Sequence, residues 1–267
     1  HPEVRLERLT TKSYVGRSVR EVFPYLRVDH SYSEYSASAL EGADVVFVCY
    51  PHAQAHEVVA ELIDAGCRVV DLSADFRLTD PKAYETWYGF EHPRADLVAE
   101  AVYGLPEKYR KEVAGARLVA NPGCYPTGAI LGLLPAVRNA LIDSSSIIVD
   151  AKSGTSGAGR KADVAVSYCE VNEGFRAYAI GTHRHTPEIE QELSLLAGRE
   201  IAVTFTPHLL PADRGILTTI YAPLLKKTGV SEVLKKYNDA YRKEPFVRVL
   251  DYGLYPNIKH VRGTNFC

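Results

Sequence analysis

The sequence predicts an α/β protein in which a doubly wound domain with a parallel sheet is followed by an α+β domain with a mixed sheet. Residues 43–49 (ADVVFVC) form a continuous apolar run, which is typical of a strand buried on both faces. A helix over 52–65 and a second strand over 67–72 follow after short connections. Strand–helix–strand units of this kind form parallel sheets with right-handed crossovers. In the second half, strands follow one another with few helices between them.

The other elements of the first half rest on shorter patterns. Residues 4–9 alternate between apolar and charged side chains, which predicts a strand. The helix over 52–65 has an apolar face, and Gly66 provides its stop. Residues 117–120 (RLVA) predict another buried strand, and the apolar stretch 129–141 predicts a helix after it.

The second half contains a longer series of short elements. We predict a helix over 186–197 and an amphipathic helix over 231–242 with Ser231 as its N-cap. The predicted strands of this half are 146–152, 200–206, 216–224 and 246–251.

Composition excludes several classes of function. The 267 residues include 31 Lys and Arg against 33 Asp and Glu, so the formal net charge of −2 gives no general attraction to nucleic acid or membranes. No apolar run approaches the roughly 20 residues that a membrane-spanning helix needs. The cysteines are odd in number and lack C-x-x-C spacing, which disfavours a disulfide framework or a structural zinc site. We therefore expect a protein of the reducing cytoplasm.

Cys124 is the most informative residue. It lies in 121–128 (NPGCYPTG), between a predicted strand and a predicted helix. The positive potential and unpaired N–H groups of a helix N-terminus favour the thiolate, which is the nucleophilic form of cysteine. Pro126 suits the first helical position. The alternative is a buried structural cysteine.

A second motif, GTHRHTPEIE (181–190), places two histidines just before a predicted helix. His183 or His185 can act as a general acid or base, because the pKa of imidazole lies near neutrality. Glu188 follows His185 by three residues and can orient its ring, and cysteine, histidine and carboxylate together activate a thiol nucleophile. A plain surface loop and a metal site built on H-x-H are the alternatives.

Two further segments are candidates for anion binding. Arg77 lies in DLSADFRL (71–78), after a parallel strand, and offers a fork for phosphate or carboxylate. A salt bridge to Asp75 or Asp80 is an equal alternative there. The loop 153–160 (SGTSGAGR) offers backbone N–H groups but lacks P-loop spacing, and the chain contains no G-x-G-x-x-G.

Taken together, these motifs resemble the N-acetyl-γ-glutamyl-phosphate reductases, a family related to the aspartate-semialdehyde dehydrogenases. The matching blocks occur in family order over essentially the whole chain. They are VFVCYPH (46–52), DLSADFRL (71–78), YGLPE (103–107), NPGCYPT (121–127), KSGTSGAGR (152–160), GTHRHTPEI (181–189), FTPHLLPADRGI (205–216) and GTNFC (263–267). The family's first strand and its glycine-rich loop would precede His1, and a further segment would follow Cys267. We therefore expect this chain to be part of a longer protein.

The resemblance implies a Rossmann-like NADP-binding domain over 1–123, a catalytic and oligomerisation domain over 124–260, and a return toward the first domain over 261–267. It implies reduction of an acyl phosphate to an aldehyde by NADPH through a cysteine thioester, in a homodimer or homotetramer that uses no metal. The implied catalytic residues are Cys124, His185, His183 and Glu188. The implied substrate-binding residues are Arg77, Asn121, Tyr178 and Arg184. The implied cofactor-binding residues are Lys12, Ser13, Pro51, His52, Ser153, Gly154 and Asn265.

Two alternatives remain open at this level. One is a sister reductase that acts on aspartyl phosphate or on a carrier-linked aminoadipyl phosphate. The other is a catalytically idle binding module that keeps the fold, which the presence of Cys124 and both histidines disfavours.

Overall fold

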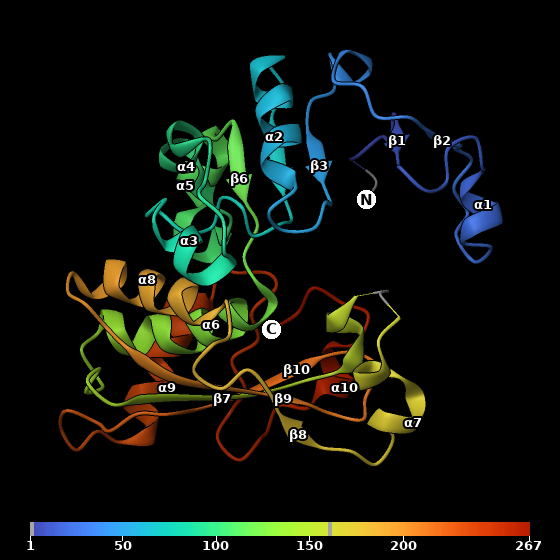
Figure 1. Ribbon diagram of the computed structural model, residues 1–267. Coiled ribbons are helices and arrows are strands. Elements are labelled where there is room, and N and C mark those ends of the chain that lie inside the picture. The colour runs from blue at the N-terminus through green and yellow to red at the C-terminus, as the bar shows by residue number, and fades with distance from the viewer. Residues whose placement is uncertain (1–2, 160–161) are drawn as a thin grey trace. The chain divides into compact units, whose positions relative to one another are not determined.

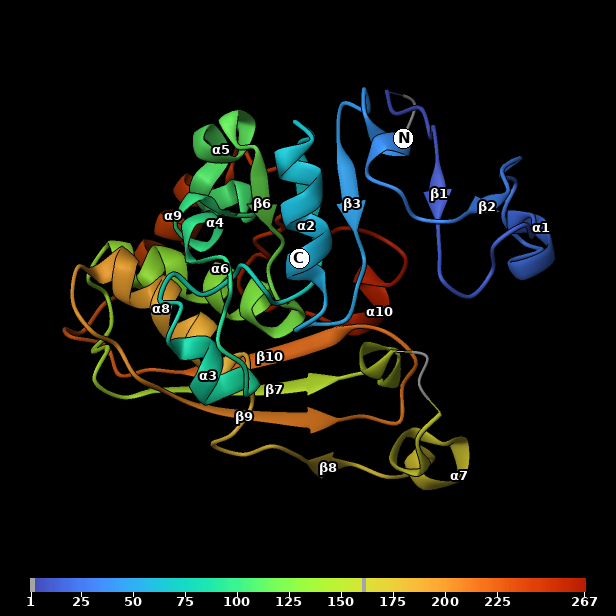
Figure 2. The same cartoon turned by 45° about the horizontal axis from the view of Figure 1, so that its top comes forward.

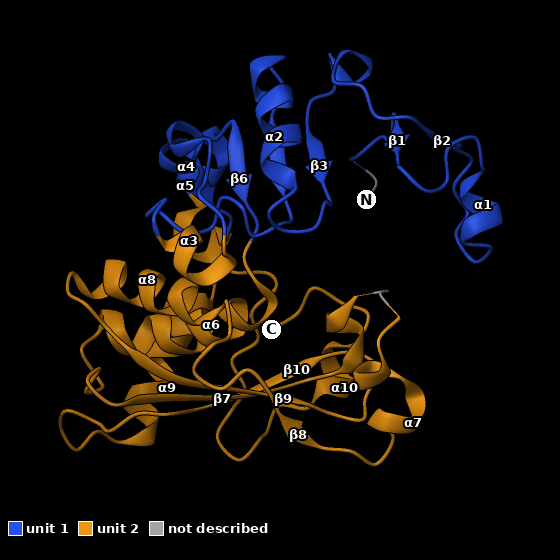
Figure 3. Ribbon diagram, viewed as in Figure 1, with its two compact units in different colours: residues 1–82, 90–104, 111–121 blue, residues 83–89, 105–110, 122–267 orange. Residues whose placement is uncertain are grey.

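The computed structural model describes residues 3–159 and 162–267, and the elements named below are those of these residues (Figure 1). The chain divides into two compact units (Figure 3). Unit 1 comprises residues 1–82, 90–104 and 111–121, and unit 2 comprises residues 83–89, 105–110 and 122–267. Residues 261–267, for which the sequence predicted a return toward the first domain, group with unit 2.

Unit 1 is built on the predicted parallel sheet. Its strand order is β3-β4-β6-β5, and every neighbouring pair is parallel. The strands are β3 (Val46–Val48), β4 (Val69–Asp71), β5 (Val102–Tyr103) and β6 (Leu118–Ala120). The order confirms the predicted strand–helix–strand unit, because the helix α2 (Ala55–Asp64) connects β3 to its parallel neighbour β4.

The helix α2 packs on this sheet through its buried apolar face, which includes Val59 and Leu62. Its first N–H groups are satisfied by a carboxylate from the loop after β4. Asp75 accepts hydrogen bonds from the backbone N–H groups of Ala53 (2.6 Å), Ala55 (3.0 Å) and His56 (3.1 Å). Asp75 is fully buried, so this one side chain ties the loop after β4 to the start of α2.

The first predicted strand is largely wrong. Of residues 4–9 only Leu9 is in a strand, β1 (Leu9–Thr10), which pairs in parallel with β2 (Tyr32–Ser33) in a separate two-stranded sheet. Residues 3–8 are exposed, so the alternation buries no apolar face. The other helices that lie wholly in unit 1 are α1 (Val19–Val22), α4 (Ala95–Glu100) and the 3-10 turn Ser38–Leu40.

Unit 2 is built on a mixed sheet, as predicted, with the order β10-β7-β9-β8. The long strands β7 (Ile147–Ser153) and β9 (Val203–Leu209) are parallel, whereas β10 (Ile216–Tyr221) and the short β8 (Arg176–Ala177) pair antiparallel to their neighbours. On β7 the side chains of Ile147, Val149 and Ala151 are buried and those between them are less so. One face of the sheet therefore carries the core of unit 2.

Two helices cover that face (Figure 2). They are α6 (Cys124–Arg138) and α8 (Thr186–Ala197), which pack against each other and against the sheet. The predicted helix 186–197 is confirmed, whereas α6 begins five residues before the predicted start at 129. Proline does not prevent this early start, because Pro126 falls in the first helical turn, where an N–H has no acceptor within the helix.

Two other predictions of the second half need correction. The helix α9 (Val230–Tyr241) has Gly229 rather than Ser231 at its N-cap, and Ser231 is its second residue. Residues 246–251 form no strand. Arg248 N–H donates to the carbonyl of Cys267 and Cys267 N–H to that of Phe246. Two further backbone bonds of this segment, from Val247 N–H to Glu244 O and from Leu254 N–H to Asp251 O, are local turns.

The remaining elements of the chain are short or divided between the units. In unit 2 they are α3 (Ala83–Tyr88), the 3-10 turns Thr155–Ala158 and Val164–Val166, α7 (Tyr168–Val171) and α10 (Ile258–Val261). The helix α5 (Pro106–Gly115) crosses the division between the units and is interrupted at Tyr109, whose φ is −125°.

A proline inside α6 explains one contact between helices. Pro135 has no N–H, so the carbonyl of Leu131, four residues earlier, loses its helical donor. The hydroxyl of the buried Tyr241, at the end of α9, donates to this carbonyl. Tyr237, one turn earlier on α9, donates to the carbonyl of Gly132 (2.7 Å). The carbonyl of Gly132, which accepts from Tyr237, also accepts the helical N–H of residue 136. The carbonyl of Leu131, which accepts from Tyr241, has no helical donor.

This difference predicts unequal effects of removing the two hydroxyls. We expect Tyr241→Phe to lower the free energy of unfolding by about 1–3 kcal/mol, because it leaves a buried carbonyl unpaired. The matched variant Tyr237→Phe should cost no more than about 1 kcal/mol, because its acceptor keeps a donor. Urea denaturation of both variants measures the difference, and equal costs would contradict this account of Pro135.

Candidate active site

The predicted nucleophile lies at the elbow between β6 and α6. The strand ends at Ala120, Gly123 is the N-cap with extended backbone angles (φ −64°, ψ 153°), and Cys124 is the first residue of α6. The Cys124 side chain is exposed, so it is not the buried structural cysteine of the alternative interpretation. A thiol at this position experiences the positive end of a 15-residue helix.

Glu188 and His185 meet at the same elbow. Glu188, in the first turn of α8, is fully buried, and its Oε1 accepts a hydrogen bond from the N–H of Gly123 at 2.7 Å. A Cβ atom placed on Gly123 would lie 2.6 Å from His185 Nε2 and 2.9 Å from Glu188 Oε2. The imidazole of His185 and the carboxylate of Glu188 therefore both lie directly against Gly123, the residue that precedes Cys124. Sequence reasoning named Cys124, His185 and Glu188 but not Gly123, whose missing side chain makes the approach possible.

His183 has a different environment from His185. Its Nδ1 accepts a hydrogen bond from the backbone N–H of His185 at 3.1 Å. Its ring is in edge-to-face contact with Tyr125, Tyr178 and Phe205, with centroid separations of 5.3–5.7 Å. Burial, together with the positive charge of the neighbouring Arg184, lowers the pKa of His183 to about 4. His183 is therefore neutral near pH 7.

Tyr178 faces the protein interior through a pair of tyrosine hydroxyls. The Tyr178 and Tyr125 hydroxyls are 2.8 Å apart, and the Tyr125 hydroxyl donates to the carbonyl of His208 at 3.3 Å. Burial raises the pKa of both phenols. The sequence assigned Tyr178 to substrate binding by resemblance and overlooked Tyr125, although Tyr125 directly follows the nucleophile.

Arg184 is exposed and lies over the ring of Tyr88, with Cζ 5.3 Å from the ring centroid. A guanidinium held on an aromatic face keeps its planar set of donors directed outward. Four residues are assigned to substrate binding. Among them, Arg184 is the one that is positively charged, exposed and part of unit 2.

The loop of Ser153 and Gly154 does not form the expected anion-binding nest. Its N–H groups bind the backbone of 212–215: Gly154 N–H donates to Gly215 O, and Thr155 N–H donates to Ala212 O, both at 2.9 Å. A Cβ on Gly154 would lie 2.7 Å from Asp213 O, so glycine serves close packing of two loops. Arg160, at the end of this motif, lies outside the described residues.

Arg77 and Asn121 are joined to each other within unit 1. Arg77 is nearly buried, and its guanidinium donates through Nε to the carbonyl of Asn121 (2.7 Å) and through Nη2 to that of Leu72 (3.1 Å). Asn121 N–H in turn donates to Asp71 O at 2.8 Å. Arg77 thus holds the chain three residues before Cys124, by contacts that an anion-binding role would not require.

The residues assigned to the cofactor fall in different places. In unit 1, the Lys12 ammonium lies 5.1 Å from the centroid of the Tyr50 ring, which brings Lys12 and Ser13 close to the turn that contains Pro51 and His52. All four residues are exposed and follow the ends of β1 and β3. Asn265 is exposed near the end of unit 2.

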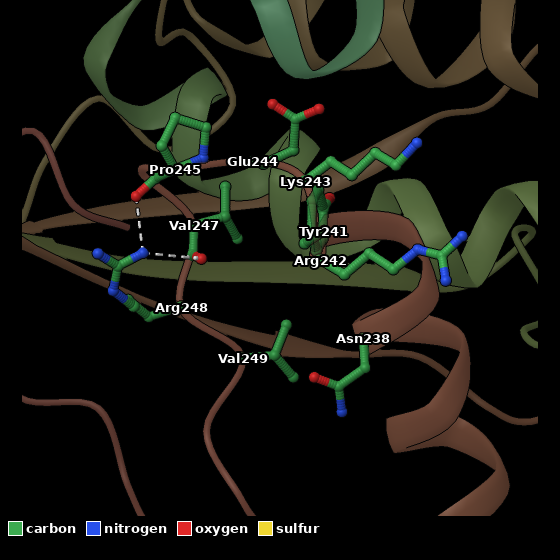
Figure 4. A pocket seen from close by; sticks show the side chains of 9 residues that line it. All are labelled: Asn238, Tyr241, Arg242, Lys243, Glu244, Pro245, Val247, Arg248 and Val249. Atoms are coloured by element: carbon green, nitrogen blue, oxygen red, sulfur yellow. Dashed lines mark hydrogen bonds between the residues drawn. The ribbon is translucent and has the colours of Figure 1, made fainter.

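Other features of the described residues concern metals, membranes and cavities. Within residues 3–159 and 162–267, no cluster of three His, Cys, Asp or Glu side chains could hold a metal ion. No helix in these ranges is long and apolar enough to cross a membrane. Figure 4 shows a hollow in unit 2 lined by residues between 238 and 249, where Arg248 donates to the carbonyls of Pro245 and Val247. None of the predicted site residues lines it.

The crowding around Gly123 predicts the effect of a single methyl group. Gly123→Ala should lower kcat by at least about tenfold, because the new Cβ displaces His185 or Glu188 from the elbow and small misplacements are costly in catalysis. The backbone angles of Gly123 suit alanine, so the cause is steric. Gly128→Ala, on the same helix, is the control, since its Cβ would come no closer than 3.3 Å to Thr218 Oγ1. Equal kcat values for the two variants would contradict the argument.

Asp71 predicts a pH dependence of stability. The residue is fully buried at the end of β4, and burial raises its pKa to about 6. The folded protein thus binds this proton more tightly than the unfolded chain does. The free energy of unfolding therefore falls by about 2–3 kcal/mol as the pH rises from about 4 to about 6.

In Asp71→Asn we expect this part of the stability profile to be flat. Urea denaturation between pH 4 and pH 7 tests it, with the exposed Asp80→Asn as control. A profile that stays as steep in Asp71→Asn as in the parent would contradict the prediction.

Comparisons with known proteins agree with the architecture. Residues 1–116 match the family model described as semialdehyde dehydrogenase, NAD binding domain, and residues 124–267 match that of the semialdehyde dehydrogenase, dimerisation domain. Among solved structures, the aspartate semialdehyde dehydrogenase of Francisella tularensis aligns with a TM-score of 0.66 at 13% identity, over 97% of this chain and 80% of that one. The NADP-bound enzyme from Candida albicans aligns with a TM-score of 0.65 at 16% identity, over 98% of this chain and 79% of that one. Similarity at this level shows the fold.

Curated relatives are much more similar in sequence. The N-acetyl-gamma-glutamyl-phosphate reductase of Pelotomaculum thermopropionicum is 52% identical over 273 residues, and that of Geobacter metallireducens is 53% identical over 271 residues. Each alignment covers 100% of this chain and 78% of the relative. With both family models matched and identities of this size over its whole length, the chain belongs to the N-acetyl-γ-glutamyl-phosphate reductase family of the semialdehyde dehydrogenases.

Proposed function

We propose that this protein catalyses the NADPH-dependent reductive dephosphorylation of N-acetyl-γ-glutamyl phosphate to N-acetylglutamate semialdehyde, a step of arginine biosynthesis. The observation that carries this proposal is the meeting of His185 and Glu188 at Gly123, next to the exposed Cys124. The names of the curated relatives supply the substrate.

The first chemical step is acyl transfer to sulfur. The Cys124 thiolate attacks the carbonyl carbon of the acyl phosphate, the carbon–oxygen bond to phosphate breaks, and inorganic phosphate leaves a thioester on the enzyme. Glu188 takes the N–H of Gly123, so that group does not serve the developing oxyanion. The N–H of Tyr125, in the first turn of α6, has no helical acceptor and is the donor that we assign to it.

His185 is the proposed acid and base. It takes the proton of the Cys124 thiol to form the attacking thiolate, and it returns a proton to sulfur as the carbon–sulfur bond breaks and the aldehyde leaves. Glu188, fixed on the backbone of Gly123, orients the imidazole. His183 does not suit this role, because its pKa of about 4 makes it a weak base near neutral pH.

The residues of unit 1 that are assigned to the cofactor suit the binding of NADP. Lys12, held beside Tyr50, offers an ammonium group for a ribose 2′-phosphate at the carboxyl end of β3, where α/β sheets bind nucleotides. Ser13, Pro51 and His52 provide exposed groups around it. When bound, NADPH supplies the hydride that reduces the thioester carbon. In unit 2 we retain Ser153, Gly154 and Asn265 as cofactor contacts only by resemblance.

Substrate recognition needs a cation for the carboxylate of the acetylglutamyl group. We assign this role to Arg184, whose guanidinium is exposed and fixed over Tyr88. Arg77 supports the site through Asn121 rather than by contact with an anion. The substrates of the sister reductases, aspartyl phosphate and aminoadipyl phosphate, also carry an α-carboxylate that such a cation can bind, so a panel of acyl phosphates is the test that discriminates between these activities.

The proposal extends to the assembly and the compartment of the protein. The match to a dimerisation domain supports a homo-oligomer, either a dimer or a tetramer. The five cysteines are all free thiols, which suits the reducing cytoplasm.

Two variants test the covalent mechanism in the intact protein. Cys124→Ser should lower kcat by at least about 10³-fold, because the nucleophile is lost. His185→Asn should lower kcat by about 10²–10⁴-fold and flatten the pH–rate profile near neutrality, because the proton carrier is lost. The assay is the reverse reaction, in which semialdehyde, phosphate and NADP⁺ produce NADPH. If Cys124→Ser kept more than a few per cent of the activity, the covalent mechanism would be wrong.

A further inference from the structure

His183 carries an inference beyond the roles assigned so far. Its Nδ1 accepts the backbone N–H of His185 (3.1 Å), so the proton of the neutral ring is on Nε2. In this state the ring has a single hydrogen-bond acceptor, Nδ1. Its donor is the backbone N–H of His185, the residue whose side chain reaches Gly123.

The ring of His183 is fixed by its neighbours. Tyr125, Tyr178 and Phe205 surround it with ring edges, and each comes from a different part of unit 2: α6, the segment after β8, and β9. Edge-to-face contacts of this kind restrict rotation of a ring as well as bury it. Three elements therefore determine the orientation of one imidazole.

The two tyrosine hydroxyls hold this enclosure together. Because the Tyr125 hydroxyl donates to His208 O, its oxygen accepts from the hydroxyl of Tyr178. The chain of donors runs from Tyr178 through Tyr125 to the backbone of β9, the strand that also contains Phe205. Tyr125 directly follows Cys124 in α6, so the same side chain ties the start of that helix to His183.

We propose that His183 is a positioning residue, which places the backbone and imidazole of His185 at the Cys124 elbow and does not itself exchange protons with substrate. This inference rests on the proposed function, because it assigns the acid–base role to His185. Its physical requirement is narrow. Position 183 needs a rigid hydrogen-bond acceptor at the δ position, and nothing that ionises near neutral pH.

Substitutions that keep or remove the acceptor separate positioning from proton transfer. His183→Leu removes the acceptor and should lower kcat by about 10–100-fold with little change in KM, since misplacement of a catalytic group affects the transition state. His183→Asn restores an acceptor, Oδ1, near the position of Nδ1 and should recover most of that loss. The neutral-pH limb of the pH–rate profile should remain in both variants, because it belongs to His185. Tyr178→Phe should produce a smaller loss than His183→Leu.

A second readout does not need the substrate. The rate of Cys124 alkylation by iodoacetamide as a function of pH reports on the pairing of thiol and imidazole. The pH dependence of this alkylation rate should differ from that of the parent protein in His183→Leu and should return to it in His183→Asn. If His183→Leu fails to fold, judged by circular dichroism, His183→Gln takes its place, because its acceptor lies one bond farther out.

The outcomes are distinct. Rescue by asparagine in both kcat and alkylation supports positioning. Equal losses of about 10²-fold or more in the leucine and asparagine variants, with loss of the neutral-pH limb, would make His183 the acid–base residue. Parent-like behaviour of both variants would show that position 183 has no role. A parent protein that does not convert N-acetylglutamate semialdehyde contradicts the proposed function, while the alkylation comparison still tests the positioning role.

Discussion

The hydrogen bond between Glu188 and the N–H of Gly123 is the constraint on which the site depends. It joins the first turn of α8 to the start of α6 and places a fully buried carboxylate at the positive end of the helix that begins with Cys124. The carboxylate and the imidazole of His185 come so close to Gly123 that a methyl group there would overlap both. The proposed nucleophile, base and orienting acid therefore meet at one backbone position.

Much of this arrangement is predictable from local sequence. The parallel strand–helix–strand unit follows from an apolar run and an amphipathic helix, and α8 has the bounds that its pattern predicts. The proposed roles of Cys124, His185 and Glu188 follow from residue type and spacing, because a cysteine at a helix start and a histidine three residues before a carboxylate each have a local chemical meaning. Local rules suffice wherever the deciding contact lies within one turn or one strand.

The remaining features depend on contacts between distant segments. The first predicted strand has the right alternation but buries nothing, so no sheet face selects it. The glycine loop 153–160 looks like an anion nest until its N–H groups meet residues 212–215. Arg77 looks like an anion fork, but its donors reach the carbonyls of Leu72 and Asn121. For the glycine loop and for Arg77, a partner far along the chain (residues 212–215 and Asn121) decides the role, and no pattern within the segment specifies that partner.

Burial of two acids on α8 explains why this helix can serve as a fixed support. Glu192, one turn after Glu188, is also buried, and its carboxylate binds the Lys108 ammonium and the Tyr109 hydroxyl, both at 2.8 Å. A buried carboxylate is tolerated only with donors of fixed geometry, so each acid sets its partners as firmly as it is set by them. One acid fixes α8 to residues 105–110, and the other fixes it to the elbow of Cys124. The imidazole of His185, at the N-cap of this helix, inherits its position from both.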